Sequence, residues 1–227
     1  MRQLLLDWGT PRPPTLESFV VGRNQELAAL LQQIAAGAAP AKDQLLLIWG
    51  EAGAGKSHVL KALSAIPAAL LLSPAATVEA FGWSSDYALY LVDDCDRLDP
   101  AQQQALFNLI NQVRENGGVL ITSAQQAPLQ LPLREDLRTR LGWGLVYQVH
   151  SLSDDEKVDA LAKSAEARGL SLSAGVLPYL LTHFRRDMQS LSTMLDALDR
   201  YSLETQRPIT LPLLRELLQT SDSTRSA

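Results

Sequence analysis

Cysteine is scarce in this sequence: Cys95 is the single thiol, so no disulfide can form within the chain. A lone thiol is typical of proteins kept in a reducing compartment, and we expect the cytoplasm. No apolar run approaches the ~18 residues of a membrane-spanning helix, and the apolar run at 4–6 is too short for a signal-peptide core. These absences favour an ordinary globular protein of the cytoplasm.

Basic blocks are also missing, since 20 Lys and Arg stand against 25 Asp and Glu, for a net charge of −5. Proteins that bind DNA tightly usually present a basic face to its phosphates, so we expect no direct sequence-specific DNA binding. The three histidines and Cys95 show no spacing typical of a metal site. With 227 residues, of which 46% are hydrophobic, the chain can bury the core of one large domain or two modest ones.

The order of apolar patterns divides the chain. Three prolines in residues 1–18 indicate an irregular arm. Residues 19–150 alternate strand and helix patterns, which predicts an α/β domain with a parallel sheet flanked by helices. Its expected strands are 45–49, 68–72, 88–92, 118–122 and 144–149, and its expected helices are 24–36, 56–65, 100–115 and 133–140. Residues 151–218 show only helical patterns, at 153–168, 173–184, 187–205 and 211–218, so we expect a small all-α domain and then a disordered tail, 219–227.

The run from Gly50 to Ser57 directly follows the strand 45–49 and fits the pattern G-x-x-x-x-G-K-[ST] of a phosphate-binding loop. Its glycines let backbone N–H groups surround phosphate oxygens, because no Cβ stands in the way. Lys56 adds a positive charge for the outer phosphates, and Ser57 can ligate Mg²⁺. We therefore predict nucleotide contacts at Gly50, Ala52, Gly53, Ala54, Gly55, Lys56, Ser57 and His58. The alternative is a glycine-rich loop with no ligand.

Two carboxylates, Asp93 and Asp94, follow the strand 88–92. Ligands bind at the carboxyl edge of a parallel sheet, so we expect both acids beside the phosphate loop. Asp93 can then hold Mg²⁺ through water, and Asp94 can orient or deprotonate an attacking water, which makes it a candidate catalytic residue. The alternative is a pair of solvated acids at the end of a strand.

Hydroxyl side chains, Thr122 and Ser123, end the strand 118–122. In a sheet of this kind, the strand beside the acidic one brings a polar group near the γ-phosphate. Either hydroxyl suits this role, and we assign it to Ser123. Strands that end in hydroxyl residues are common, so the pattern is weak by itself.

Three arginines occupy positions that a ligand or partner would explain. Arg138 and Arg140 end the helix 133–140, just before Gly142-Trp143-Gly144. An arginine on such a turn suits presentation to a neighbouring subunit, where it would stabilise charge on that subunit's γ-phosphate; the alternative is a surface arginine that packs on the Trp. Arg186 stands near the start of the helix 187–205, where a cation opposes the helix dipole, and this favours a role over the nucleotide.

Apolar side chains also occur on the expected arm, within Gln3-Leu4-Leu5-Leu6-Asp7-Trp8. Short apolar and aromatic segments of this kind often dock in a groove of another protein. The alternative is an arm that folds back on its own core.

In combination, these motifs resemble the AAA+ ATPases of the DnaA branch, over about residues 19–218. The segment Phe19-Val20-Val21-Gly22-Arg23-Asn24 resembles the lining of the adenine pocket in that family, which implies nucleotide contacts at Val20 and Val21. The stretch 138–144 resembles the box that holds the arginine finger, which falls on Arg140. The segment Arg186-Asp187-Met188 resembles the second sensor, and so assigns Arg186 to the nucleotide.

The amino-terminal motif resembles the clamp-binding hexapeptide Q-L-x-L-x-φ, and the chain stops near Leu218 with no room for the DNA-reading domain of full initiators. This combination resembles short DnaA relatives that act with the DNA polymerase III beta sliding clamp to drive hydrolysis of DnaA-bound ATP. The resemblance implies clamp contacts at Gln3, Leu4, Leu6 and Trp8, a finger at Arg140 acting on DnaA, and ADP or ATP with Mg²⁺ as cofactors.

Two departures from the family concern hydrolysis by the chain itself. Ala124 and Gln125 stand where relatives commonly show an acid and an arginine, and Asp94 stands where most AAA+ proteins have glutamate. Two other functions therefore stay open: a self-assembling AAA+ ATPase that remodels DNA or protein, and an adaptor that recruits DnaA to DNA with a structural nucleotide. A homo-oligomer also stays open.

Overall fold

The structure is a computed structural model that describes residues 13–37, 45–184 and 187–217. These residues form two compact units, one within residues 13–151 and one within residues 152–217. The domain limits expected from the sequence, 19–150 and 151–218, stay predictions beside these units. Most of the expected arm and the expected tail, 219–227, lie outside the described residues.

The first unit is built on a five-stranded parallel sheet. Its strands are β1 (Leu45–Trp49), β2 (Ala69–Leu72), β3 (Leu89–Val92), β4 (Val119–Ala124) and β5 (Leu145–Gln148), in the order β2-β3-β4-β1-β5. Because all five are parallel, the loops after β1, β3 and β4 emerge at the same edge of the sheet. The α/β fold expected from the sequence is confirmed.

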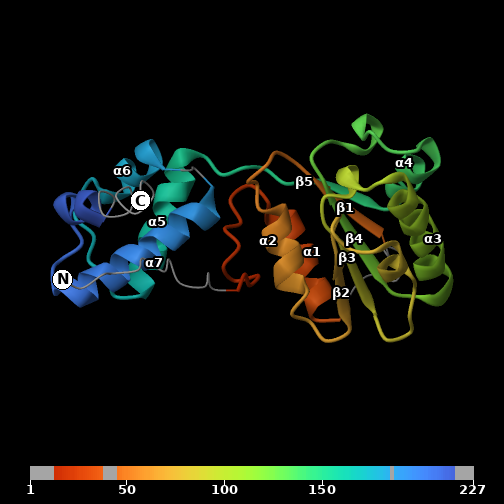
Figure 1. Cartoon of the computed structure of the whole chain (residues 1–227), viewed down its shortest axis with the longest axis horizontal. Helices are drawn as coiled ribbons and strands as arrows, with labels where there is room; N and C mark the ends of the chain where they lie inside the picture. The colour runs from red at the N-terminus through yellow and green to blue at the C-terminus, as the bar shows by residue number, and fades with distance from the viewer. Residues whose placement is uncertain (1–12, 38–44, 185–186, 218–227) are drawn as a thin grey trace, which may run out of the picture. The chain divides into compact units, whose positions relative to one another are not determined.

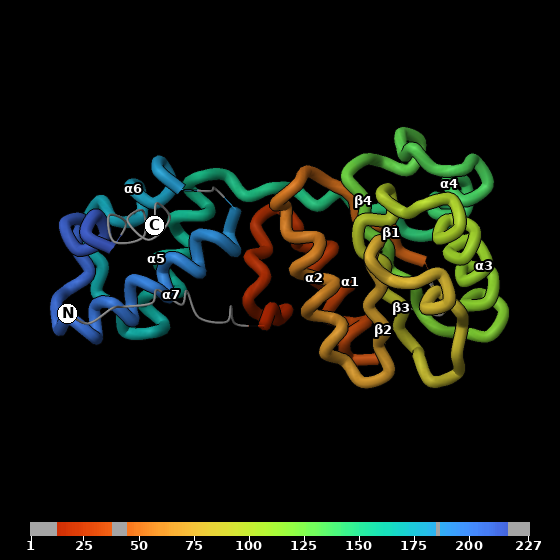
Figure 2. The backbone as a smooth tube through the Cα atoms, in the orientation of Figure 1, coloured from red at the N-terminus to blue at the C-terminus, as the bar shows by residue number. Residues whose placement is uncertain are grey.

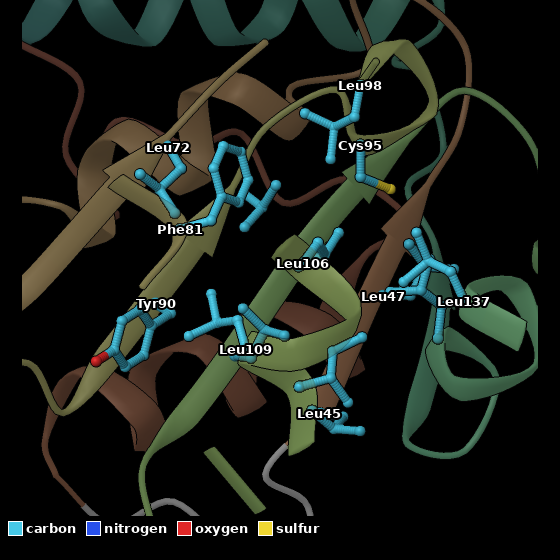
Figure 3. Packing of buried hydrophobic residues seen from close by; sticks show 14 of the residues in the cluster. Leu45, Leu47, Leu72, Phe81, Tyr90, Cys95, Leu98, Leu106, Leu109 and Leu137 are labelled. Carbon is cyan, nitrogen blue, oxygen red and sulfur yellow. The ribbon is translucent and has the colours of Figure 1, made fainter. Parts of the chain in front are cut away.

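Helices cover both faces of this sheet (Figure 1). Helices α1 (Gln25–Ala35) and α2 (Lys56–Leu63) pack with Leu46 and Ile48 of β1 on one face. Helices α3 (Pro100–Asn116) and α4 (Glu135–Leu141) pack with Leu45 and Leu47 on the other. Side chains alternate along a strand, so β1 has an apolar core on each side. Figure 3 shows the α3–α4 side, where Leu137 lies beside Leu47.

The start of α3 confirms a local sequence signal. The Asp99 carboxylate accepts a hydrogen bond from the Gln102 N–H at 2.8 Å, and the Gln102 side chain accepts one from the Asp99 N–H at 3.0 Å. Pro100 occupies the first helical position, where its missing N–H is not needed. Three short 3₁₀ helices, η1 (Val78–Phe81), η2 (Cys95–Arg97) and η3 (Pro128–Gln130), were not expected, because three or four residues show no periodicity.

The second unit contains α5 (Asp154–Ala167), α6 (Val176–His183), α7 (Met188–Thr205) and a further helix over residues 211–217. Ser153 and Glu156 form the expected capping box of α5. The helix expected from Ser173 begins only at Val176, because Gly175 before it adopts a left-handed conformation, with φ 92°. No helix in the described parts of the chain is both long and apolar enough to cross a membrane.

Candidate functional site

The glycine-rich loop follows β1, and its Gly55 lies directly before α2 as the N-cap, with φ +103°. L-residues rarely adopt this conformation, and a Cβ at Gly55 would lie 2.9 Å from the Phe19 ring. The close approach of Phe19 therefore requires glycine here as much as the turn does. The loop leads into the start of α2, whose free N–H groups favour an anion.

Lys56 is the buried cation of this loop. Its Nζ donates to Gly50 O at 2.7 Å and to Glu51 O at 2.9 Å, and only 6% of the residue is exposed. Burial lowers the pKa of Lys56, while the negative charges of Asp94, Asp93 and Asp96 act in the opposite direction. The ammonium thus lies among loop carbonyls and within the field of the three carboxylates that follow β3.

The acid pair Asp93–Asp94 is tied to the neighbouring strand by Ser123. The Ser123 hydroxyl donates to Asp93 Oδ1 at 2.6 Å and accepts from the Asp94 N–H at 2.9 Å. Asp94 adopts a left-handed conformation, with φ 49° and ψ 50°, and its carboxylate lies 3.5 Å from Arg97 Nη1. One buried hydroxyl on β4 therefore holds the carboxylate of Asp93 and the backbone of Asp94, both of which follow β3.

This geometry distinguishes the two hydroxyl candidates of β4. Ser123 is fully buried and its donor is engaged by Asp93, whereas Thr122 Oγ1 makes no hydrogen bond to any described residue. Burial is the main cause that raises the pKa of the Cys95 thiol. β4 also runs to Ala124, so both hydroxyl residues lie inside the strand that was expected to end at residue 122.

The side chains at this edge fit Mg²⁺ bound together with a nucleotide. Ser57 and Asp93 offer a hydroxyl and a carboxylate, the hard oxygen donors that Mg²⁺ combines with phosphate oxygens and water. No group of three His, Cys, Asp or Glu side chains in the described ranges could hold a metal alone. These donors therefore suit Mg²⁺ that binds together with a nucleotide. They are less suited to a metal ion that the protein holds without a nucleotide.

The segment expected at the adenine pocket lies against α2 (Figure 2). The His58 ring nitrogen Nε2 lies 3.0 Å from Thr15 O and 3.1 Å from Ser18 Oγ, and the Phe19 ring lies 6.2 Å from the His58 ring. Burial is the main cause that lowers the pKa of His58. The His58 side chain thus holds the segment that directly precedes Val20 and Val21.

Arg140 lies away from this loop. It stands in the last turn of α4, on the sheet face opposite α2, and its guanidinium contacts the rings of Phe107 and Trp143. Just after Trp143, a Cβ at Gly144 would lie 2.0 Å from the carbonyl oxygen of Leu45, the first residue of β1. The phosphate loop begins after Trp49, at the other end of the same strand.

Sequence patterns missed three residues of these clusters. Asp96 has a buried Oδ1 without a hydrogen bond to any described residue, and its charge acts on Lys56. Phe107 and Arg114 contact the side chains of Arg140 and Trp143 from α3. A helical apolar pattern marks Phe107 only as a core residue, so no motif signalled its contact with an arginine.

Several predicted site residues lie outside the described residues. These are Gln3, Leu4, Leu6 and Trp8 of the clamp motif and Arg186 of the second sensor. Their assignments rest on the sequence alone.

The phosphate loop after β1, the acid pair after β3 and the hydroxyl on the strand between them define a P-loop nucleotide-binding protein of the AAA+ class. Family models match both units: residues 12–79 match the bacterial DnaA ATPase domain, and residues 154–218 match the Hda lid domain. A protein of Haemophilus influenzae, described only as uncharacterized, is 33% identical over 217 residues, which is 90% of this chain and 93% of that protein. The chain belongs to the DnaA-like AAA+ family and carries a lid of the Hda type.

Solved structures agree on the fold. Domain III of the Thermotoga maritima replication initiation protein DnaA superposes with a TM-score of 0.71 at 19% identity, over 93% of this chain and 98% of that chain. AMPPCP-bound DnaA from Aquifex aeolicus gives 0.68 at 18% identity, over 84% and 66%. The RuvB Holliday junction branch migration motor of Thermotoga maritima gives 0.67 at 14% identity, over 92% and 72%.

Proposed function

We propose that this chain regulates the initiation of DNA replication by stimulating hydrolysis of ATP bound to DnaA, while it is held on the DNA polymerase III beta sliding clamp. In this proposal Arg140 enters the nucleotide site of DnaA and stabilises the negative charge that develops on the γ-phosphate. An arginine supplied in trans is worth about 10³–10⁵ in rate in other nucleotide hydrolases.

The observation that carries this proposal is the position of Arg140 relative to the chain's own phosphate loop. The two lie on opposite faces of the sheet and at opposite ends of β1, which is five residues long and therefore spans roughly 16 Å. An arginine in that position cannot reach a phosphate held by its own Lys56. This position supports a role for Arg140 on a nucleotide held by another molecule.

The phosphate loop of the chain has a second role in this account, which is to hold ADP or ATP. Lys56 would bind the outer phosphates, Ser57 and Asp93 would hold Mg²⁺, and Val20 and Val21 would contact adenine. Mg²⁺ supplies charge neutralisation between phosphates when it is bound. The AMPPCP-bound DnaA relative supports an adenine nucleotide at this loop. Binding here would fix the conformation of the chain rather than serve rapid turnover.

Clamp binding rests on the amino-terminal motif. Gln3 and Leu4 begin the hexapeptide, and Leu6 and Trp8 supply its later apolar contacts. Replacing Gln3 and Leu4 with Ala should abolish retention of the chain by immobilised clamp. Continued retention would show that the arm has another role.

A self-assembling ATPase is the second candidate. The observation that favours it is that hydrogen bonds fix the acid pair in place. Ser123 already orients Asp93 and the backbone of Asp94, and a carboxylate at Asp94 can in principle activate water. This candidate predicts substantial ATP turnover by the purified chain alone. The main proposal predicts turnover that depends on DnaA and on clamp-loaded DNA.

The test is hydrolysis of DnaA-bound ATP in the presence of the chain, the clamp and DNA, with each component omitted in turn. Arg140→Ala should lose stimulation and keep binding of nucleotide and clamp. Arg138→Ala is the matched control, because Arg138 lies in the same turn of α4 and is also partly exposed. If stimulation survives Arg140→Ala but not Arg138→Ala, the finger is Arg138. If stimulation survives both substitutions, the proposed arginine finger on α4 is refuted.

A further inference from the structure

Four side chains from α3, α4 and the turn after α4 form a continuous stack of rings and cations. The Arg140 Cζ lies 4.3 Å from the centroid of the Phe107 ring and 4.8 Å from that of Trp143. The Arg114 Cζ lies 4.8 Å from the same Trp143 ring. Rings and guanidinium groups therefore alternate in the order Phe107, Arg140, Trp143, Arg114, and we call this set the arginine ladder.

The helices account for this arrangement. Phe107 and Arg114 are seven residues apart on α3, so they lie on the same helix face two turns apart. Arg140 stands in the last turn of α4, which packs on α3 through a shared apolar core. Trp143 comes three residues later, where the chain turns toward β5.

The arginine ladder keeps two positive charges together without an acid. In the described ranges, no carboxylate forms an ion pair with Arg114 or Arg140, and neither guanidinium donates a hydrogen bond. The faces of the aromatic rings are negative and partly offset the repulsion between the two cations. With no hydrogen bond to a described residue, the N–H donors of both guanidinium groups stay available to an anion.

The stack also restricts Arg140 before any partner arrives. A free arginine side chain samples many rotamers, and ordering it opposes binding. Contact with two rings removes much of that freedom in the unbound protein. Trp143 is 53% exposed and Phe107 is half-buried, so the ordered cations lie at a surface that another molecule can approach.

We propose that Phe107 and Trp143 are positioning residues for Arg140, and that Arg114 adds a second positive charge directed at the same anionic surface. The anionic surface is the phosphate-bearing nucleotide site of a partner protein, and its assignment to DnaA rests on the proposed function. The restricted motion of the Arg140 side chain within the ladder is a property of this chain alone. It can be measured without a partner.

The first experiment is NMR of the arginine Nε–Hε groups in the full chain, assigned with the variants Arg140→Lys and Arg114→Lys. Aromatic rings should shift both wild-type signals upfield, and the Arg140 group should be as ordered as the backbone. Trp143→Leu should move both signals toward the positions of free arginine. Leu129→Ala, which changes an 88% exposed side chain, should move neither. An unshifted, mobile Arg140 signal in the wild type would overturn the positioning role.

The second experiment is single-turnover hydrolysis of DnaA-bound ATP at increasing concentrations of the chain on clamp-loaded DNA. Phe107→Leu and Trp143→Leu should each lower the maximal rate about tenfold with little change in the half-saturating concentration, because the finger is then misplaced in the transition state. Trp143→Phe keeps a ring and should retain most of the rate. Arg114→Ala should raise the half-saturating concentration about threefold and weaken its dependence on salt.

The outcomes separate this inference from the proposed function. If Arg140→Ala abolishes stimulation while Trp143→Leu folds normally and stimulates fully, the ladder proposal fails and the finger stands. If the wild type gives no stimulation, the function on DnaA fails, and the NMR signals alone decide whether the ladder orders Arg140. If Arg140→Ala stimulates normally, the assignment of the finger to Arg140 fails. A maximal rate unchanged in both ring variants would overturn the positioning role.

Discussion

Replacing Ser123 with Ala tests the link between the two strands that carry the acid pair. The hydroxyl accepts from the Asp94 N–H at 2.9 Å and donates to Asp93 at 2.6 Å, and Ser123 is fully buried. Loss of the hydroxyl leaves a partly buried N–H unpaired, which costs about 1–3 kcal/mol. The partly exposed Asp93 can regain a bond from water. We therefore expect the free energy of unfolding of the sheet unit to fall by about 2 kcal/mol.

Thr122→Val is the matched control for this variant. Thr122 is equally buried on the same strand, and its Oγ1 has no hydrogen bond to any residue that the structure describes. Valine has the same shape without the unpaired hydroxyl, so the change should be neutral or slightly stabilising. Urea unfolding followed by tryptophan fluorescence gives the comparison, with a lower midpoint at unchanged slope expected for Ser123→Ala alone.

Ser123→Ala should also weaken binding of magnesium-ADP about tenfold in a calorimetric titration, since Asp93 loses the group that orients it. Equal unfolding midpoints for Ser123→Ala and the wild type would refute this reasoning. A larger loss in Thr122→Val than in Ser123→Ala would refute it as well.

Three further predictions concern individual contacts. Gly55→Ala should weaken magnesium-ADP binding about tenfold more than Gly117→Ala, because both glycines have positive φ but only Gly55 has a ring within 3 Å of the added Cβ. Burial keeps the pKa of His58 below the ordinary value of about 6.5, so the unfolded state binds more protons as the pH falls. The free energy of unfolding is therefore highest above about pH 6.5 and decreases as the pH falls below that value. His58→Asn should therefore flatten the decline of the urea midpoint with falling pH. Asp99→Ala should lower the stability of the sheet unit by about 1 kcal/mol in the same assay, because it removes the capping box of α3.

Each of these has a contradicting result. Equal nucleotide affinities of the two glycine variants would contradict the role of the close approach at Gly55. An unchanged pH dependence in His58→Asn would contradict the burial of His58. An unchanged urea midpoint in Asp99→Ala would show that the cap contributes nothing to folding.

The sequence predicts those parts of the fold that depend on residues close together in the chain. The strand 45–49 and the run from Gly50 to Ser57 form one local motif, and the caps at Asp99 and Ser153 mark helix starts by their own hydrogen bonds. Periodicity predicts the helices of the second unit, although α6 begins three residues later than expected. The strand order β2-β3-β4-β1-β5 does not follow from any local pattern, since it depends on which strands pair.

The parts that sequence does not predict depend on contacts between distant segments. The bond from Ser123 to Asp93 joins residues thirty positions apart, so no local pattern predicts it. Phe107 fits a helical apolar pattern, which predicts only that it lies in the core. Its contact with Arg140 appears only when α3 and α4 pack together.

The central claim is that Arg140 acts on a nucleotide held by another protein, and one measurement tests it most directly. DnaA is loaded with γ-labelled ATP, freed of excess nucleotide, and mixed with the chain on clamp-loaded DNA, so that only DnaA-bound label is hydrolysed. The account predicts rapid release of labelled phosphate with the wild type, and rates at least about a hundredfold lower with Arg140→Ala and with Arg140→Lys, since an ammonium lacks the planar fork of a guanidinium. Release at the wild-type rate with Arg140→Ala would contradict the account.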